Sequence, residues 1–287
     1  MPDLNDLVAV VTGASRGAGR GIALELGAAG ATVYVTGRSV EGGPTTDNVP
    51  GTIGATAGEV TTRGGRGIAI RCDHTVDADV EAVFERVRAD CGRLDLLVNN
   101  VWGGYESPDC RPLPLVPFWE QSRRQWDGMF TAGVRAHLVA SQFAVPLMLQ
   151  RRRGLIVSTT ANLDPLPYLS NIFYDVSKHA VARLVWAMAR ELEKDGIAVV
   201  AVAPGFMRTE RVVEAFRRAG AEAALDAGGG PKETTAYLGR AIVALASDAN
   251  VREKSGQMLE AGTLATEYGF TDVNGTQPPP FRLPAAK

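Results

Sequence analysis

Short apolar runs rich in β-branched residues alternate along the chain with longer segments of helical periodicity. This alternation is typical of βαβ units, which build a parallel sheet with helices on both faces. The predicted strands cover residues 7–12, 32–36, 67–73, 94–99, 154–159, 197–203 and 257–261. The predicted helices cover residues 17–29, 52–63, 76–91, 123–150, 172–195 and 233–247. The pattern therefore predicts an α/β fold with one doubly wound, seven-stranded parallel sheet.

Four segments interrupt this rhythm. Residues 39–51 are rich in Gly, Pro, Thr and Asp, and we interpret them as an insertion in the loop after the second strand. Residues 101–117 are predicted to form an extended loop. Residues 206–232 form the expected substrate loop, whose part rich in Ala and Gly suggests a mobile lid. The tail from about 276 to 287 is expected to be irregular, so the whole chain, residues 1–287, is predicted to be a single domain.

Composition and charge narrow the possible functions. The chain has 287 residues, 45% of them hydrophobic and 22% charged, which is the balance of an ordinary soluble domain. A net charge of -2 argues against nucleic-acid binding, which needs a basic stripe. The 3 cysteines lack the number and spacing of a disulfide framework or zinc site, so no metal is expected. No secretory signal or membrane-spanning run is apparent, and the expected location is the cytoplasm.

A glycine-rich loop follows the first predicted strand and opens the first predicted helix. It reads Thr12-Gly-Ala-Ser-Arg-Gly-Ala-Gly19. Glycines allow the backbone to turn sharply and to approach a pyrophosphate, and the positive end of the helix stabilises the negative charge. The context of strand, loop and helix favours a dinucleotide site over an ordinary glycine-rich turn.

The end of the second strand bears on the choice of dinucleotide. An acidic residue is usual here in NAD-binding folds, whereas this chain has Arg38. A guanidinium pairs with the ribose 2′-phosphate of NADP, and Arg16 in the glycine loop could add a second positive charge. We therefore expect NADP(H) to be preferred over NAD(H). The alternative is that Arg38 is an ordinary surface arginine.

Tyr174 and Lys178 are four residues apart in a predicted helix and therefore share one of its faces. An ammonium near a phenol stabilises the phenolate, which should lower the pKa of Tyr174. Such a tyrosine can transfer a proton to or from a substrate oxygen. The same spacing is common on solvated helices, so the pair alone does not indicate catalysis. The glycine loop upstream is what favours a catalytic role for it.

Four motifs occur in one order: the glycine loop, Asn99-Asn100 after the fourth strand, Tyr174-x-x-x-Lys178, and Pro204-Gly205 after the sixth strand. In this order and spacing, over about residues 5–265, the chain resembles the classical short-chain dehydrogenase/reductase family. The resemblance implies a single Rossmann-type three-layer domain and an oxidoreductase. Other stretches, such as Tyr268 to Gly275, resemble one branch that is associated with NADPH-linked reduction of carbonyl compounds.

The resemblance also implies roles for individual residues. Tyr174 would be the proton donor, and Lys178 would lower its pKa and hold the nicotinamide ribose. Other positions would bind the cofactor. Gly13, Ser15, Arg16, Gly17 and Gly19 would form the pyrophosphate loop, Asp73 and His74 would border the adenine, and Asn100 would lie along the cofactor. Pro204, Gly205 and Met207 would cover the nicotinamide, and Thr209 would lie near its carboxamide or near the phosphates. His74 has an alternative interpretation as a polar loop residue.

Two residues that the family uses are missing. The substrate-orienting serine is replaced by Ala161, and either Thr160 or Ser158 could supply a hydroxyl instead, although neighbouring strand residues point to opposite faces. The asparagine that supports a water relay to the lysine is replaced by Gly133, where a glycine could leave room for water. Losing one donor to a developing oxyanion typically lowers turnover by about 10² to 10³.

The expected substrate pocket is apolar. Its predicted wall includes Trp102, Tyr105, Phe118, Leu163, Leu166, Tyr168, Phe173, Phe206 and Met207. Such a lining favours a small apolar carbonyl compound or secondary alcohol, although several of these residues could be ordinary core or oligomer contacts. The family resemblance further implies a homodimer or homotetramer.

These observations predict an NADP(H)-dependent oxidoreductase of the carbonyl reductase type, with Tyr174 as the general acid and base. One alternative is a weakly active protein or a sensor of NADP(H), which Gly133 and Ala161 would favour. Another is a related lyase, epimerase or dehydratase on the same scaffold.

Overall fold

A computed structural model describes residues 2–46, 49–104, 116–161, 168, 171–226 and 232–282. Within these residues, seven parallel strands form one sheet in the order β3-β2-β1-β4-β5-β6-β7. The strands are β1 (Val8–Val11), β2 (Thr32–Gly37), β3 (Arg66–Arg71), β4 (Leu96–Asn99), β5 (Gly154–Thr159), β6 (Ile197–Ala203) and β7 (Met258–Glu260). The predicted α/β fold with a doubly wound, seven-stranded parallel sheet is confirmed.

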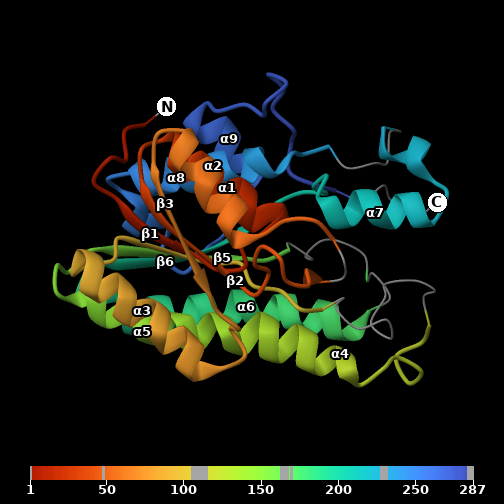
Figure 1. The fold of residues 1–287 in the computed structure, drawn as a ribbon, viewed down its shortest axis with the longest axis horizontal. Helices are drawn as coiled ribbons and strands as arrows, with labels where there is room; N and C mark the ends of the chain where they lie inside the picture. The colour runs from red at the N-terminus through yellow and green to blue at the C-terminus, as the bar shows by residue number, and fades with distance from the viewer. Residues whose placement is uncertain are drawn as a thin grey trace.

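Helices cover both faces of the sheet (Figure 1). One face carries α1 (Gly17–Ala28), α2 (Ile53–Thr62), α8 (Thr235–Ser247) and α9 (Ala261–Tyr268). The other face carries α3 (Asp77–Cys91), α5 (Ala136–Leu149) and α6 (Ile172–Glu191). This three-layer arrangement buries the central strands from both sides, as their nearly continuous apolar sequences predict.

Each face of the sheet has its own hydrophobic core. Along β1, Ala9 and Val11 face the α1 and α8 side, whereas Val8 and Val10 face the α3 and α5 side. All four residues of β1 are buried. Because successive strand residues point to opposite faces, a shift of one residue in the pairing would exchange the two sets, so the packing fixes the strand register.

The predicted helix at residues 123–150 is not a uniform α-helix. It begins as α4 (Arg124–Trp126), continues as the π-helical turn η3 (Asp127–Arg135) and ends as α5. The run Arg124–Leu149 is apolar and long enough to cross a membrane, but the same is true of core helices in soluble proteins. Within its most apolar stretch, 56% is buried inside the protein. π-helical segments often occur at functional sites, and this one contains Gly133.

Two helices lie in segments where none was predicted. The helix α7 (Glu210–Arg218) begins in the expected substrate loop, where Thr209 caps it by accepting a hydrogen bond from the Val212 amide at 3.3 Å. The helix α9 follows directly after β7. Short helical turns lie at η4 (Glu193–Asp195), η5 (Glu222–Leu225) and η6 (Val251–Lys254). The helices α7 and α9 are short, so they depend on tertiary contacts more than on local propensity.

The tail is irregular over the described residues 276–282, as predicted, but it packs against the domain. The Tyr237 hydroxyl of α8 donates to the Pro278 carbonyl at 2.8 Å, and Arg282 pairs with Glu260 at the end of β7. A side chain at Gly262 would clash with the backbone of Pro280 at 2.4 Å. The tail therefore returns from α9 to the end of β7, the edge strand of the sheet.

Candidate active site

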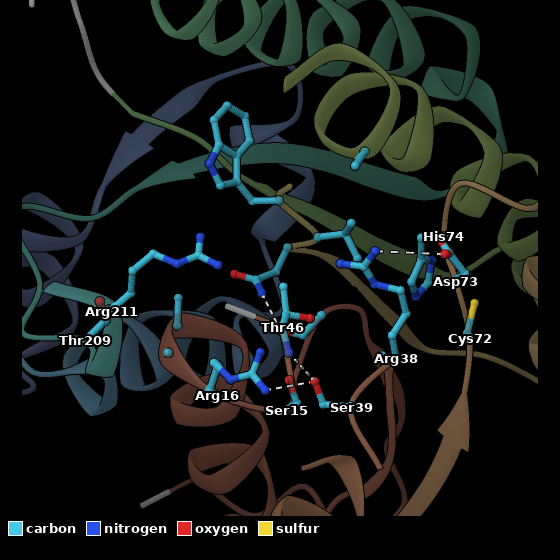
Figure 2. A pocket seen from close by; sticks show the side chains of 18 of the residues that line it. Ser15, Arg16, Arg38, Ser39, Thr46, Cys72, Asp73, His74, Thr209 and Arg211 are labelled. Atoms are coloured by element: carbon cyan, nitrogen blue, oxygen red, sulfur yellow. Dashed lines mark hydrogen bonds and ion pairs between the residues drawn. The ribbon is translucent and has the colours of Figure 1, made fainter. Parts of the chain in front are cut away.

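A cavity of about 250 Å³ opens at the carboxyl ends of the parallel strands, where β1 and β4 are adjacent and the strand order reverses. Open α/β sheets bind ligands at this position. The glycine loop, Arg38 after β2, the Cys72–Thr75 turn after β3 and the start of α7 line it, and Figure 2 shows side chains from these elements around one space. Val101, Trp102 and Ala132 also line it.

The backbone of the glycine loop requires glycine. Gly13 and Gly17 have φ values of +64° and +58°, in the left-handed region that disfavours other residues. A Cβ at Gly19 would lie 2.4 Å from the carbonyl oxygen of Gly13. The Asn100 side chain also donates to the carbonyl oxygens of Thr12 and Gly13, both at 3.1 Å. The loop is therefore fixed in a conformation that points the start of α1 at the cavity.

A carboxylate already occupies part of the helix N-terminus. The amide of Gly17 donates to Glu210 Oε2 at 2.8 Å, so the first residue of α7 contacts the first residue of α1. Glu210 and its neighbour Arg211 both line the cavity. Neither residue was identified from the sequence, because 193 positions separate Glu210 from Gly17.

Charged groups gather at the cavity wall where β2 and β3 end. Arg38 Nη1 lies 3.9 Å from Asp73 Oδ2, and both residues line the cavity. Burial opposes ionisation of Asp73, but hydrogen bonds from Thr75 and the charge of Arg38 outweigh it and lower its pKa. His74 is buried, with its Nε2 atom 2.8 Å from the Thr36 hydroxyl, and burial lowers its pKa to about 4. His74 is therefore neutral at physiological pH.

Arg16 has a structural role that the sequence did not predict. Its Nη2 atom donates to Ser39 Oγ at 2.8 Å and to the Gly51 carbonyl at 2.7 Å, and its Nε atom donates to the Pro50 carbonyl at 3.2 Å. The side chain thus ties the glycine loop to both ends of the 39–51 insertion. Its charge remains at the cavity wall, next to Ser15 and Gly17.

Tyr174 and Lys178 lie one turn apart on α6, and Trp102 contacts both. The Lys178 ammonium lies 3.7 Å from the centre of the Trp102 ring and 5.7 Å from that of Tyr174. The rings of Trp102 and Tyr174 meet edge to face, with centroids 5.8 Å apart. Asn171 caps the helix by accepting a hydrogen bond from the Tyr174 amide at 2.9 Å. Trp102 lines the cavity, whereas Tyr174 and Lys178 do not.

The pKa values of the pair differ from the sequence-based expectation. Burial raises the pKa of Tyr174 to about 12, and it lowers the pKa of Lys178 to about 7. The predicted lowering of the Tyr174 pKa by the lysine is therefore wrong for this arrangement, because desolvation disfavours both charged forms. Tyr174 is a protonated phenol at neutral pH, which is the form that can donate a proton.

The hydroxyl groups near the missing serine have other partners or none. Thr160 Oγ1 donates to the Lys178 main-chain carbonyl at 3.0 Å. Its role as donor to a substrate oxygen stays a prediction, since it would have to exchange this bond. Ser158 is fully buried on β5, and its hydroxyl has no partner among the described residues. Ala161 is half-buried and offers no polar side chain.

Gly133 faces an aromatic ring. A Cβ at this position would lie 2.8 Å from the Trp102 atoms Cε3 and Cζ3. The space that we expected to hold a water molecule is therefore taken by the indole, because the ring packs directly against the glycine. A tryptophan two residues after Asn100 was the available signal for this contact.

The Pro204-Gly205 turn after β6 is held by a buried glutamate. Glu233 Oε2 accepts a hydrogen bond from the Gly205 amide at 2.8 Å, and Met207 forms an isolated parallel bridge with Glu233. Burial raises the pKa of Glu233 to about 7, in spite of the hydrogen bond from Gly205. Thr209 lines the cavity, whereas Pro204, Gly205 and Met207 do not.

The predicted substrate wall is only partly assembled. Phe206 contacts Phe216 of α7 and Phe281 of the tail, with centroids 6.4 and 6.5 Å apart. Phe118 and Tyr168 are exposed and belong to the protein surface. Three other predicted positions, Tyr105, Leu163 and Leu166, lie outside the described residues. No cluster of metal-binding side chains occurs in the described part of the chain.

The fold and the site define a nucleotide-binding α/β oxidoreductase, and comparisons with known proteins give the family. The short chain dehydrogenase family profile matches residues 7–219, and the chain belongs to this family, whose members bind NAD(P)(H). Human dehydrogenase/reductase SDR family member 1 is 37% identical over 95% of this chain and 85% of its own length. The Escherichia coli 3-oxoacyl-[acyl-carrier-protein] reductase FabG is 30% identical over 84% of this chain and 90% of its own.

Solved structures agree with the fold. A putative dehydrogenase from Xanthomonas campestris superposes with a TM-score of 0.78 and 25% identity, and the match covers 97% of this chain and 95% of the other. The resemblance stated from the sequence motifs is thereby confirmed, as is the Rossmann-type architecture.

Proposed function

We propose that the protein transfers hydride between NADP(H) and an apolar ketone or secondary alcohol, with Tyr174 as general acid and base. The observation that carries this proposal is the continuity of the site. The cavity runs from Arg38 after β2 to Trp102, and Trp102 contacts Tyr174 and Lys178. A dinucleotide in the cavity would therefore direct its nicotinamide end toward the tyrosine and lysine.

The cavity wall fits a dinucleotide. Gly13, Gly17 and Gly19 leave the backbone open to a close ligand, since side chains at two of them would strain the loop and one at the third would clash with it. The buried His74 Nδ1 atom has no hydrogen-bond partner among the described residues, and it lies beside the cavity. An adenine edge could supply that partner.

Arg38 supports NADP(H) over NAD(H). It follows β2, where a carboxylate would repel a ribose 2′-phosphate and a guanidinium would attract it. The distance of 3.9 Å between Arg38 and Asp73 is longer than a close hydrogen-bonded pair, and Arg38 is partly exposed. The guanidinium lies at the cavity wall, where it would meet a 2′-phosphate.

The proposed chemistry divides between cofactor and protein. The nicotinamide supplies or accepts the hydride. In the reducing direction, the O–H bond of Tyr174 breaks and its proton forms a new O–H bond at the carbonyl oxygen of the substrate. The protonated state that burial imposes on Tyr174 suits this donation. In its charged form, Lys178 would stabilise the resulting phenolate.

An apolar substrate and a homo-oligomer in the cytoplasm complete the proposal. Phe206, Phe216 and Phe281 provide an aromatic surface beside the Pro204-Gly205 turn, which suits an apolar substrate.

The proposed homo-oligomer rests on exposed apolar side chains. Leu138 on α5 and Val176 on α6 are exposed apolar residues that a dimer would bury. Light scattering tests the assembly, and a monomer at micromolar concentration would contradict it.

One experiment tests the function. NADPH and NADH are titrated into the protein, and NADPH oxidation is then followed with a panel of aromatic and aliphatic ketones. We expect tighter binding of NADPH and turnover that disappears in Tyr174→Phe. Tight NADPH binding without turnover that depends on Tyr174 would instead support a sensor of NADP(H).

A further inference from the structure

Trp102 is placed between the candidate catalytic pair and the cavity. The Lys178 ammonium lies over the face of the indole, 3.7 Å from the ring centre, which is within the range of a cation–π contact. The same ring meets Tyr174 edge to face. Trp102 also lines the cavity, whereas Tyr174 and Lys178 do not. One side chain therefore touches the lysine, the tyrosine and the cavity.

The surrounding backbone leaves room for this ring. A Cβ at Gly133 would lie 2.8 Å from two indole carbons, and a Cβ at Gly104 would lie 2.6 Å from two others. Any larger residue at either position would displace the indole. The glycine that occupies the expected asparagine position of the family thus has a specific partner in this chain.

Hydrogen bonds fix the residue before the tryptophan. His137 Nε2 lies 3.2 Å from the Val101 carbonyl oxygen, and the Val101 amide donates to Thr12 Oγ1 at 3.3 Å. Burial lowers the pKa of His137 to about 3, so its ring is neutral and Nε2 carries the hydrogen toward the carbonyl. The indole is consequently supported at its own backbone as well as at its ring.

We propose that Trp102 is a positioning residue, which holds the Lys178 ammonium against its ring in place of the asparagine that Gly133 replaces. This inference rests on the proposed function. The negative face of an indole attracts a cation without accepting its protons. An ammonium has three N–H groups, and contact with the ring face does not use all of them. Burial disfavours the charged form of Lys178 and lowers its pKa. An aromatic face stabilises the positive charge and therefore counteracts this effect of burial.

Binding measurements separate positioning from ordinary packing. Trp102→Leu keeps an apolar side chain but removes the aromatic face, Trp102→Phe keeps a smaller face, and Trp126→Leu is the control. Trp126 is 53% exposed and stacks on Phe130. Each variant is titrated with NADPH and with adenosine 2′,5′-bisphosphate, which lacks the nicotinamide half.

We expect Trp102→Leu to weaken NADPH binding by about tenfold, Trp102→Phe to recover part of it, and neither to change adenosine 2′,5′-bisphosphate binding by more than about twofold. Trp126→Leu should match the wild-type protein. Equal losses for both ligands would show a merely structural role, and no loss for NADPH would equally overturn the inference. If the wild-type protein binds no NADPH, the proposed function itself fails.

A second measurement needs no cofactor. Lys178→Met removes the cation beside the indole and should change the intrinsic tryptophan fluorescence of the wild-type protein, but not that of a Trp102→Phe background. Gly133→Ala should disturb the same emission, because its Cβ meets the ring, whereas Gly58→Ala, whose Cβ meets nothing within 4 Å, should not. Unchanged emission in Lys178→Met would overturn the contact regardless of catalysis.

Discussion

The two ends of the candidate site are built differently. The end near β1 and β2 is an open cavity whose shape comes from backbone, with two glycines at positive φ and the start of α1 directed inward. The end near α6 is filled with side chains, because Trp102 packs between Lys178, Tyr174 and Gly133. Binding and chemistry therefore depend on different parts of the sequence, and substitutions should separate them.

The sharpest separation is expected from Tyr174→Phe. The change removes one oxygen atom from a side chain that does not line the cavity, so the Kd for NADPH should stay within about threefold. The only proton that the proposed mechanism donates is lost, and kcat should fall by about 10² to 10⁴. Steady-state kinetics and a fluorescence titration on the same sample measure both values. A kcat near that of the wild-type protein would place the acid elsewhere.

The opposite effect is expected from Arg38→Ser. The guanidinium at the end of β2 faces the cavity, so its loss should weaken NADPH binding by about 10- to 100-fold and NADH binding by less than about threefold. The turnover of the saturated enzyme should hardly change. Arg71→Ser is a matched control, because Arg71 ends β3, is exposed and pairs with Asp79 at 3.7 Å. An equal loss for the two nucleotides would contradict a 2′-phosphate contact.

The same contrast explains what the sequence could predict. The glycine loop, Arg38 and the strands are local signals, so the sheet, and a cavity that the glycine loop and Arg38 line, followed from short stretches of chain. The contact of Gly133 with Trp102 joins residues 31 positions apart on a loop and a π-helical turn. No periodicity encodes such a contact. The pKa of Tyr174 was also misjudged, because burial cannot be seen in a spacing of four residues.

Stability should respond to pH through Glu233, which holds the Pro204-Gly205 turn. The folded-state pKa of Glu233 is raised by burial to about 7, from an ordinary value near 4.5. Below about pH 4.5 both folded and unfolded states are protonated, and as the pH rises toward 7 only the unfolded state releases the proton. The folded state therefore loses stability over this window. Glu233→Gln, which stays neutral, should be more stable than the wild-type protein at pH 8 by about 2 kcal/mol.

Urea unfolding at pH 5 and pH 8 measures this effect, with the exposed Glu222→Gln as control. His74 and His137 have lowered pKa values and change stability in the opposite direction below about pH 6.5, but they are present in all three proteins. Their contribution cancels when the proteins are compared. A Glu233→Gln variant that follows the wild-type pH dependence would show that Glu233 is ionised when folded.

The smallest expected effect concerns the contact between the start of α7 and the start of α1. Glu210 accepts a hydrogen bond from the Gly17 amide at 2.8 Å, at a helix N-terminus that attracts anions. A pyrophosphate that uses the same amide must displace this carboxylate and is repelled by its charge. Glu210→Gln should therefore bind NADPH about three- to tenfold more tightly, because an amide competes less well than a carboxylate.

Glu214→Gln provides the matched control for this change. Glu214 lies one turn further along α7, where it pairs with Arg217 and Arg218, and it does not line the cavity. The gain should appear with ADP as well as NADPH, because both carry a pyrophosphate, and should be absent with adenosine 2′-monophosphate. Weaker NADPH binding by Glu210→Gln would mean that the carboxylate supports the site by ordering α7. In that case the start of α1 and the start of α7 would act together as one binding surface.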